Sequence, residues 1–124
     1  MEEVKFSFEE LEVWQKAVDF ANNVIDLSER LNTNKQHFRL IDQLEAASTS
    51  IALNIAEGKG RYSKKEFIQF LYIARASLYE TITLLTIFEK RGWIKKEQFA
   101  VISEKAAELA RMIVGLINSI RKGL

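Results

Sequence analysis

Apolar residues recur at intervals of three and four along most of the chain, which is the spacing of one face of an α-helix. The pattern predicts four helices, at about residues 8–31, 35–57, 64–91 and 95–122. No segment alternates apolar and polar residues as a half-buried strand does. The breaks between helices are short, so consecutive helices are expected to lie antiparallel. We therefore expect an all-α fold, an antiparallel up-down-up-down four-helix bundle with short loops, as a single domain covering residues 1–124.

Short motifs predict where three helices begin, because a side-chain oxygen there accepts a hydrogen bond from an otherwise unpaired backbone N–H. The motifs are Ser7 to Glu10 for the first helix, Thr33 or Asn34 with Gln36 for the second, and Ser63 to Glu66 for the third. Glycines predict two of the helix ends. Gly58, in a left-handed conformation, is expected to close the second helix, and Gly92, after two cations, to close the third.

The third predicted helix is apolar over more than one stripe, so its apolar residues cannot all face one bundle. A helix that is apolar nearly all round is either central or in contact with a second subunit. A four-helix bundle has no central helix, which favours self-association; burial under long neighbouring side chains is the alternative. The candidate interface residues are Ile68, Phe70, Tyr72 and Tyr79.

Composition excludes several classes of function. The chain has no Cys, which removes disulfides, thiolate metal sites and cysteine nucleophiles and is typical of a reducing, cytoplasmic setting. A net charge of +1 gives no global attraction to nucleic acid. The opening MEEVKFSFEE has no apolar core of a signal peptide, and no run reaches the roughly 18 apolar residues of a membrane span. We therefore expect a cytoplasmic protein with no membrane partner.

Few residues are suited to catalysis or metal binding. The single histidine, His37, excludes a diiron site, which needs two Glu-x-x-His motifs, and a solvated first-turn residue is favoured over a haem ligand. Glu57 and Glu80 could perform acid–base chemistry only if both lined one cleft, and nothing in the sequence brings them together. We expect no enzymatic activity, and therefore no catalytic residue, metal, cofactor or small-molecule substrate.

Two basic clusters flank the third predicted helix. The segment Gly58 to Arg61 is not a phosphate loop, because such loops join a strand to a helix and this one joins two helices. The start of the third helix can still attract an anion. If the protein binds nucleic acid, the expected contacts are Lys59, Arg61, Lys64 and Lys65 at one end and Lys90, Arg91, Lys95 and Lys96 at the other. Each cluster also consists of residues that helix ends and solvated loops commonly carry.

Three stretches resemble one known family. They are FEELEVWQKA at 8–17, QLEAASTSIALNIAEGKGRYSKKEFIQFLYIARASLYE at 43–80, and Gly92-Trp93-Ile94. Together they are similar, over nearly the whole chain, to the four-helix-bundle proteins of intervening sequences in bacterial 23S rRNA genes. The accessory protein of diversity-generating retroelements is a relative. The resemblance implies a ring-shaped homopentamer with no known enzymatic activity, and the strongly basic retroelement relative works with a reverse transcriptase and nucleic acid.

The most specific part of the resemblance is SIxxNIAEGxGR, and it identifies a structural signature. Its residues, with the cap that follows, are Asn54, Glu57, Gly58, Ser63 and Glu66. Local helix chemistry does not account for Asn54 and Glu57. We predict that these two side chains hydrogen-bond across the bundle or a subunit junction and fix the direction in which the third helix leaves.

The chain departs from the family where two arginines usually follow Gln-Leu, since Glu45 and Ala46 stand there instead. The loss of positive charge predicts weaker binding of nucleic acid than in the basic relatives. Asn32 to Lys35 also replace the usual Pro-Glu helix start. Two hypotheses follow: a homo-oligomeric scaffold that presents its surface to a protein partner, or an accessory protein that binds RNA or DNA through the basic clusters.

Overall fold

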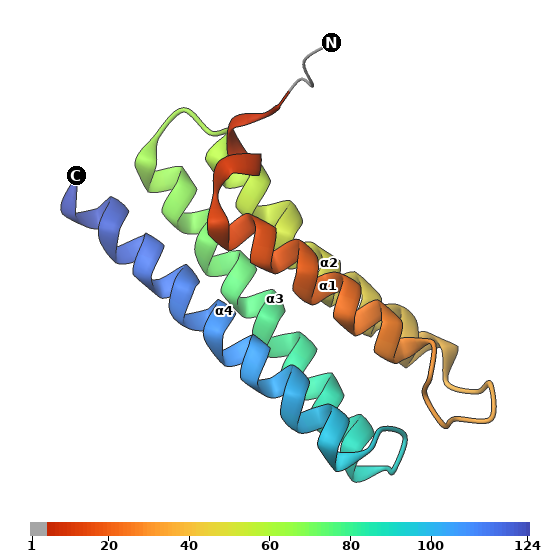
Figure 1. The fold of residues 1–124 in the computed structure, drawn as a ribbon. Helices are drawn as coiled ribbons and strands as arrows, with labels where there is room; N and C mark the ends of the chain where they lie inside the picture. The colour runs from red at the N-terminus through yellow and green to blue at the C-terminus, as the bar shows by residue number, and fades with distance from the viewer. Residues whose placement is uncertain (1–4) are drawn as a thin grey trace.

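The computed structural model describes residues 5–124, and helices packed side by side form all of its regular structure (Figure 1). The elements are η1, a short 3-10 helix (Ser7–Glu10), α1 (Glu12–Ser28), α2 (Phe38–Lys59), α3 (Lys64–Lys90) and α4 (Lys96–Lys122). Each helix packs on its two neighbours in the cycle α1, α2, α3, α4, and no close backbone contact crosses the diagonals of the described bundle. The predicted all-α four-helix bundle is confirmed. The opening MEEVKFSFEE, in which we expect no signal peptide, includes residues 1–4, and these lie outside the described residues.

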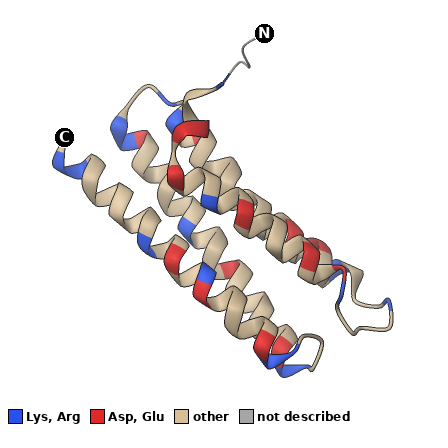
Figure 2. Cartoon of the chain, in the orientation of Figure 1, with Lys and Arg blue, Asp and Glu red and all other residues tan. Residues whose placement is uncertain are grey.

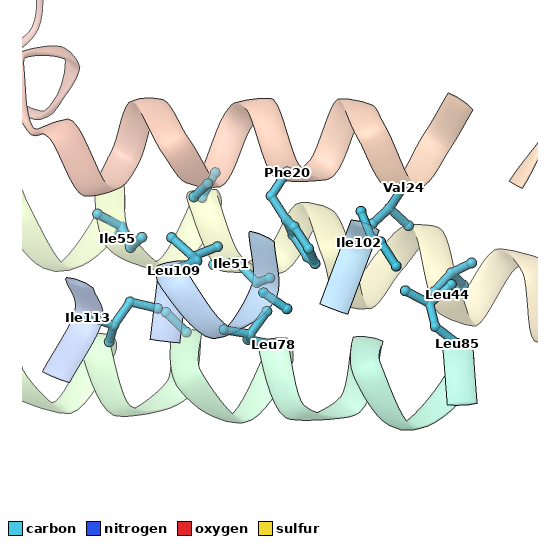
Figure 3. Close-up of a cluster of buried hydrophobic side chains, with 14 of the residues drawn as sticks. Phe20, Val24, Leu44, Ile51, Ile55, Leu78, Leu85, Ile102, Leu109 and Ile113 are labelled. Carbon is cyan, nitrogen blue, oxygen red and sulfur yellow. The ribbon is translucent and has the colours of Figure 1, made fainter. Parts of the chain in front are cut away.

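The core runs along the axis of the bundle, and all four helices supply side chains to it (Figure 3). The largest fully buried side chains include Val24, Leu44, Ile51, Ile55, Leu71, Leu78, Leu85, Phe88, Leu109, Ile113 and Ile117. Burying one such side chain stabilises the fold by about 1.5–3 kcal/mol. The apolar stripes seen in the sequence therefore provide the energy that holds the helices together.

The predicted limits of α3 are close to the observed ones. Ser63 is the N-cap, and its Oγ accepts a hydrogen bond from the backbone N–H of Glu66 at 3.1 Å. At the other end α3 stops at Lys90, and Gly92 adopts a φ of +78°. This left-handed conformation is readily available only to glycine, so Gly92 has the predicted role.

The first helix begins later than predicted. Residues 7–10 form a 3-10 turn whose N-cap is Phe6, so the predicted capping box of Ser7 and Glu10 does not form; the Phe6 N–H instead donates to Glu9 Oε2 at 2.6 Å. Leu11, in an extended conformation, separates this turn from α1. The prediction of a continuous helix over 8–31 is wrong, because an extended Leu11 interrupts the hydrogen-bond ladder at one end and α1 ends at Ser28 at the other.

The loop between α1 and α2 is longer than predicted, because α2 begins at Phe38. Thr33 is buried, and neither it nor Asn34 caps the helix; His37 occupies the N-cap position without a side-chain cap. The backbone at Asn34, at Lys35 and at His37 has φ values of +55°, +60° and +66°. Contacts to Trp93 hold the loop in place: the Asn32 N–H donates to its carbonyl oxygen at 3.0 Å, and the rings of His37 and Trp93 are 4.5 Å apart.

Gly58 does not end α2, which continues to Lys59 with Gly60 as C-cap at a φ of −79°. The glycine at position 58 is explained by close packing against α3. A Cβ atom there would lie 2.6 Å from Phe70 Cβ and 2.9 Å from Phe67 Cδ1. The predicted left-handed cap is therefore wrong, and the residue instead allows α2 and α3 to approach each other at the corner.

The helix α3 has more apolar surface than the bundle covers. Among the described helices, only α3 is long and apolar enough to cross a membrane by length and composition, a test that core helices of bundles also pass. Only 33% of its most apolar 18-residue stretch is buried within the subunit. The exposed residues of α3 lie on the side that faces away from the bundle, and we call this side the outer face of α3.

Candidate functional site

The cations predicted at the α2–α3 corner lie together at one end of the bundle (Figure 2). They are Lys59, Arg61, Lys64 and Lys65, and all four are exposed. The fold adds Arg121 and Lys122, because the last turn of α4 ends beside this corner. The Nζ atom of Lys64 is 3.2 Å from the place that a Cβ on Gly123 would occupy. Sequence reasoning missed the α4 pair because some 60 residues separate it from the corner.

Aromatic rings lie beneath two of the corner cations. The Arg61 guanidinium is 4.6 Å from the centre of the Phe70 ring, and Lys59 Nζ is 6.0 Å from that of Phe67. Such cation–π contacts position a charge at the surface and contribute about 0.5–1 kcal/mol each when exposed. Arg61 also approaches Glu57 Oε1 at 3.9 Å, an exposed pair of small energetic value.

The second predicted basic cluster lies at the opposite end of the bundle. Its residues are Lys90, Arg91, Lys95 and Lys96, all exposed. Arg91 lies over the Trp93 ring at 5.1 Å. The 27 residues of α3 separate the clusters by about 40 Å at 1.5 Å per residue. Within one subunit the two clusters therefore form two separate surfaces.

Asn54 has a hydrogen-bond network that reaches α3 only through a second residue. Its Nδ2 donates to the Ser50 carbonyl oxygen and to Ser50 Oγ, both at 2.8 Å and both within α2. Ser50 Oγ in turn lies 2.9 Å from Ser77 Oγ of α3. The direct bond predicted across the bundle is absent in the subunit, and Glu57 contacts Arg61 of the same corner instead. The network nevertheless joins α2 to α3 near the middle of both helices.

The outer face of α3 is only partly as predicted. Tyr72 and Tyr79 are 37% and 54% exposed, whereas Ile68 is 7% exposed and belongs to the subunit's own core. Phe70 is half-buried beneath Arg61. The prediction of Ile68 as a surface residue is therefore wrong, because this side chain lies on the flank of α3 that packs within the bundle.

Two further apolar residues, Ile73 and Ile87, extend this face, with exposures of 48% and 43%. Arg75 lies between the two tyrosines, 5.0 Å from the ring of Tyr72 and 5.7 Å from that of Tyr79. Arg121 of α4 donates to Tyr72 Oη at 2.7 Å. The face is therefore ordered, with the tyrosines held along its α4 side by two arginines.

A second apolar surface, which sequence reasoning did not predict, is a groove between α1 and α2 with a volume of about 460 Å³. We call it the α1–α2 groove. It is lined by Phe8, Trp14, Val18, Ala21, Asn22, Ile25, Thr49, Ala52, Leu53 and Ala56. Leu53 points outward from α2 and is 65% exposed. The signal in the sequence was present, since Leu53 falls outside the core stripe of α2.

The residues considered for acid–base chemistry and metal binding do not come together within residues 5–124. No three potential metal ligands lie together in this range. The Glu80 side chain lies opposite Gln43, whose Nε2 donates to it at 3.4 Å. Glu57 is 14 residues further along α2, which is about 21 Å of helix, so these two carboxylates do not share a cleft. The His37 ring contacts the Trp93 ring at a tilt of 31°.

Comparisons with known proteins identify relatives of the whole bundle. The model of the 23S rRNA-intervening sequence proteins matches residues 9–115. A crystal structure of a protein of unknown function from the S23 ribosomal protein family of Bacteroides thetaiotaomicron is 27% identical, with a TM-score of 0.79. The similarity covers 86% of this chain and 95% of that one. No curated protein matches the chain.

Proposed function

This chain belongs to the 23S rRNA-intervening sequence protein family, and we propose that it is a non-enzymatic scaffold that works as a homo-oligomer. The observation that carries the proposal is the outer face of α3. Among residues 67–88 only Arg75 and Glu80 are charged, and apolar side chains on this face remain exposed in the single subunit. Tyr72, Ile73, Tyr79 and Ile87 are exposed along one helix, and large exposed apolar side chains that share a face commonly mark a protein–protein contact, so a second copy is the expected cover.

A ring of five subunits is the form of this scaffold that the family resemblance implies. The Tyr72 and Tyr79 side chains suit an interface, because tyrosine buries a large apolar area while its hydroxyl keeps a polar partner. A ring would present five copies of each basic end to a partner. The absence of a shared cleft for Glu57 and Glu80 and of a metal-binding cluster in residues 5–124 favours a binding role over catalysis.

Light scattering after size-exclusion chromatography tests the self-association. Five copies of the 14.3 kDa chain have a mass of about 70 kDa. The Tyr79→Glu variant is expected to lower that mass, since burying a carboxylate without a partner costs several kcal/mol. Val101→Glu is the matched control, because Val101 is 57% exposed on α4, away from this face. A wild-type mass of 14.3 kDa at micromolar concentration contradicts the proposal.

Binding of RNA or DNA is a second candidate function, and the basic end of the bundle favours it. There α4 adds Arg121 and Lys122 to the four predicted corner cations. Tyr62, at the tip of the corner, is fully exposed and offers a ring for base stacking. One observation weighs against binding of nucleic acid elsewhere on the bundle. Glu45 stands where the family resemblance implies an arginine, and its carboxylate accepts a hydrogen bond from Ser28 Oγ at 3.2 Å. The proposed contact is therefore the corner and not the surface around Glu45.

Mobility-shift titrations with single-stranded RNA and DNA at two salt concentrations test this second function. An Arg61→Glu/Lys64→Glu variant is expected to bind at least tenfold more weakly and with a reduced salt dependence, because each phosphate contact contributes about 0.9 to the log–log slope. A Lys105→Glu variant, which changes a cation in the middle of α4, is the control. No binding at low salt rules the function out.

A further inference from the structure

We propose that the α1–α2 groove of one subunit receives the outer face of α3 from the next, so that copies associate head to tail. The inference rests on the proposed self-association and names the two surfaces that carry it. It assigns a role to the α1–α2 groove. It also explains why one molecule carries two separate apolar surfaces rather than one.

The α1–α2 groove can be emptied of water at little cost in hydrogen bonds. Its lining is apolar except for the side chains of Asn22 and Thr49 and the indole N–H of Trp14. Asn22 Nδ2 donates to the Val18 carbonyl oxygen at 3.1 Å, and Thr49 Oγ1 donates to the Glu45 carbonyl oxygen at 2.9 Å. An apolar helix that covers the groove therefore leaves these donors satisfied. The chemistry of the groove fits an apolar occupant.

The outer face of α3 has the spacing of a helix made to lie in a groove. Its outermost residues are Gln69, Ile73, Ala76, Glu80, Thr83 and Ile87, and all are exposed. They follow one another at intervals of four and three, which is the seam of a helix packed along its length against others. Thr83 Oγ1 already donates to the Tyr79 carbonyl oxygen at 2.7 Å. Gln43 holds Glu80, the only charged seam residue, toward α2.

The two surfaces match in length. Ile73 to Ile87 spans 14 residues, or about 21 Å of helix, and Trp14 to Ile25 in the groove spans 11 residues, or about 17 Å. Large side chains spaced along α3 can enter the groove beside Leu53, in the way that amphipathic helices dock into apolar grooves.

The charges of the two halves of the bundle favour contact between two different surfaces of neighbouring copies. Residues 5–59 hold 6 Lys and Arg against 9 Asp and Glu, whereas residues 60–124 hold 12 against 6. The α1–α2 half of the described bundle is therefore net −3 and the α3–α4 half net +6. A symmetric pairing of α3 with α3 places two positive halves together, while head-to-tail docking brings opposite charges together. This charge difference favours head-to-tail docking of a second copy over symmetric pairing of α3 with α3.

The positions of the two surfaces allow the assembly to close. In the cycle of packed helices, α3 is adjacent to α2 and diagonal to α1. The outer face of α3 and the α1–α2 groove are therefore neither on the same side nor on strictly opposite sides. Each head-to-tail contact turns the next copy relative to the last, and the assembly closes into a ring where that turn divides a full circle without a shift along the axis.

A mixing experiment distinguishes head-to-tail association from symmetric pairing. Leu53→Glu blocks the groove and Ile73→Glu blocks the seam, and both positions are exposed, so the fold is expected to persist in circular dichroism. Each variant alone is expected to be monomeric by light scattering. Mixed in equal amounts they form a dimer of twice the chain mass, because one intact groove meets one intact seam. A mixture that stays monomeric, or variants that remain fully assembled, overturns the inference.

Crosslinking gives an independent readout, because the chain has no cysteine of its own. A double variant Leu53→Cys/Ile73→Cys is expected to give a ladder of crosslinked species on a denaturing gel, whereas each single variant gives none. Strong crosslinking of a single variant indicates symmetric pairing and contradicts the inference. An assembled wild type without a ladder refutes only the docking mode, while a monomeric wild type refutes the proposed self-association as well.

Discussion

Replacing Gly58 by alanine tests the packing of α2 on α3. In the interior of a helix, alanine is favoured over glycine by about 1 kcal/mol, so the local effect of Gly58→Ala is stabilising. The added Cβ atom, however, would lie 2.6 Å from Phe70 Cβ and 3.3 Å from the Phe67 carbonyl oxygen. Neither atom can move by a change of side-chain rotamer, because both are fixed to the backbone of α3.

The expected loss of stability follows from the distance by which α3 must move away from α2. Ordinary contact of a Cβ atom lies at 3.4–4 Å, so the two helices must separate by about 1 Å at the corner, and overpacking of this kind costs about 1–3 kcal/mol. Loss of close contact along the adjacent Phe67 and Phe70 adds to that cost. We expect Gly58→Ala to lower the free energy of unfolding by about 1–2 kcal/mol, with the helix preference of alanine included.

The matched control is Gly115→Ala, at an interior position of α4 where an added Cβ meets no atom within 4 Å. It is expected to raise stability by about 0.5–1 kcal/mol. Urea unfolding followed by circular dichroism, at one fixed protein concentration, measures both variants and keeps self-association equal. The decisive result is that the two variants change the free energy of unfolding in opposite directions. If Gly58→Ala stabilises the protein as Gly115→Ala does, the account of close approach at the corner is wrong.

Three further substitutions test particular contacts, each by urea unfolding. Ser63→Ala is expected to cost about 1 kcal/mol through loss of the α3 N-cap; an unchanged midpoint contradicts that role. Ser77→Ala breaks the link to Ser50 and is expected to cost about 0.5–1.5 kcal/mol; adding Ser50→Ala to it is expected to cost less than Ser50→Ala alone, because only the bond from Asn54 is then left to lose. Trp93→Ala is expected to cost about 3–5 kcal/mol, because the buried ring packs on Phe88 at 4.9 Å and holds the α1–α2 loop; Trp93→Phe should recover most of it.

The candidate surfaces were predictable to different degrees. The surplus apolar residues of α3 indicated an interface, because a helix of known register leaves them no place in a four-helix core. Ile68 was misassigned, since the width of the buried stripe depends on how closely α2 and α4 approach α3. The α1–α2 groove was missed because its walls come from two helices, and its depth depends on the distance between them.

Local pattern by itself determined the helices and several of their limits in this protein. Helix-period spacing, the cap at Ser63 and the left-handed Gly92 act over three or four residues, so they can be read directly from the chain. Only the tertiary structure decided the role of Gly58, the loop held by Trp93 and the arrival of Arg121 beside Lys64. Each of these depends on contacts between distant segments, and the packing of side chains in three dimensions sets those contacts.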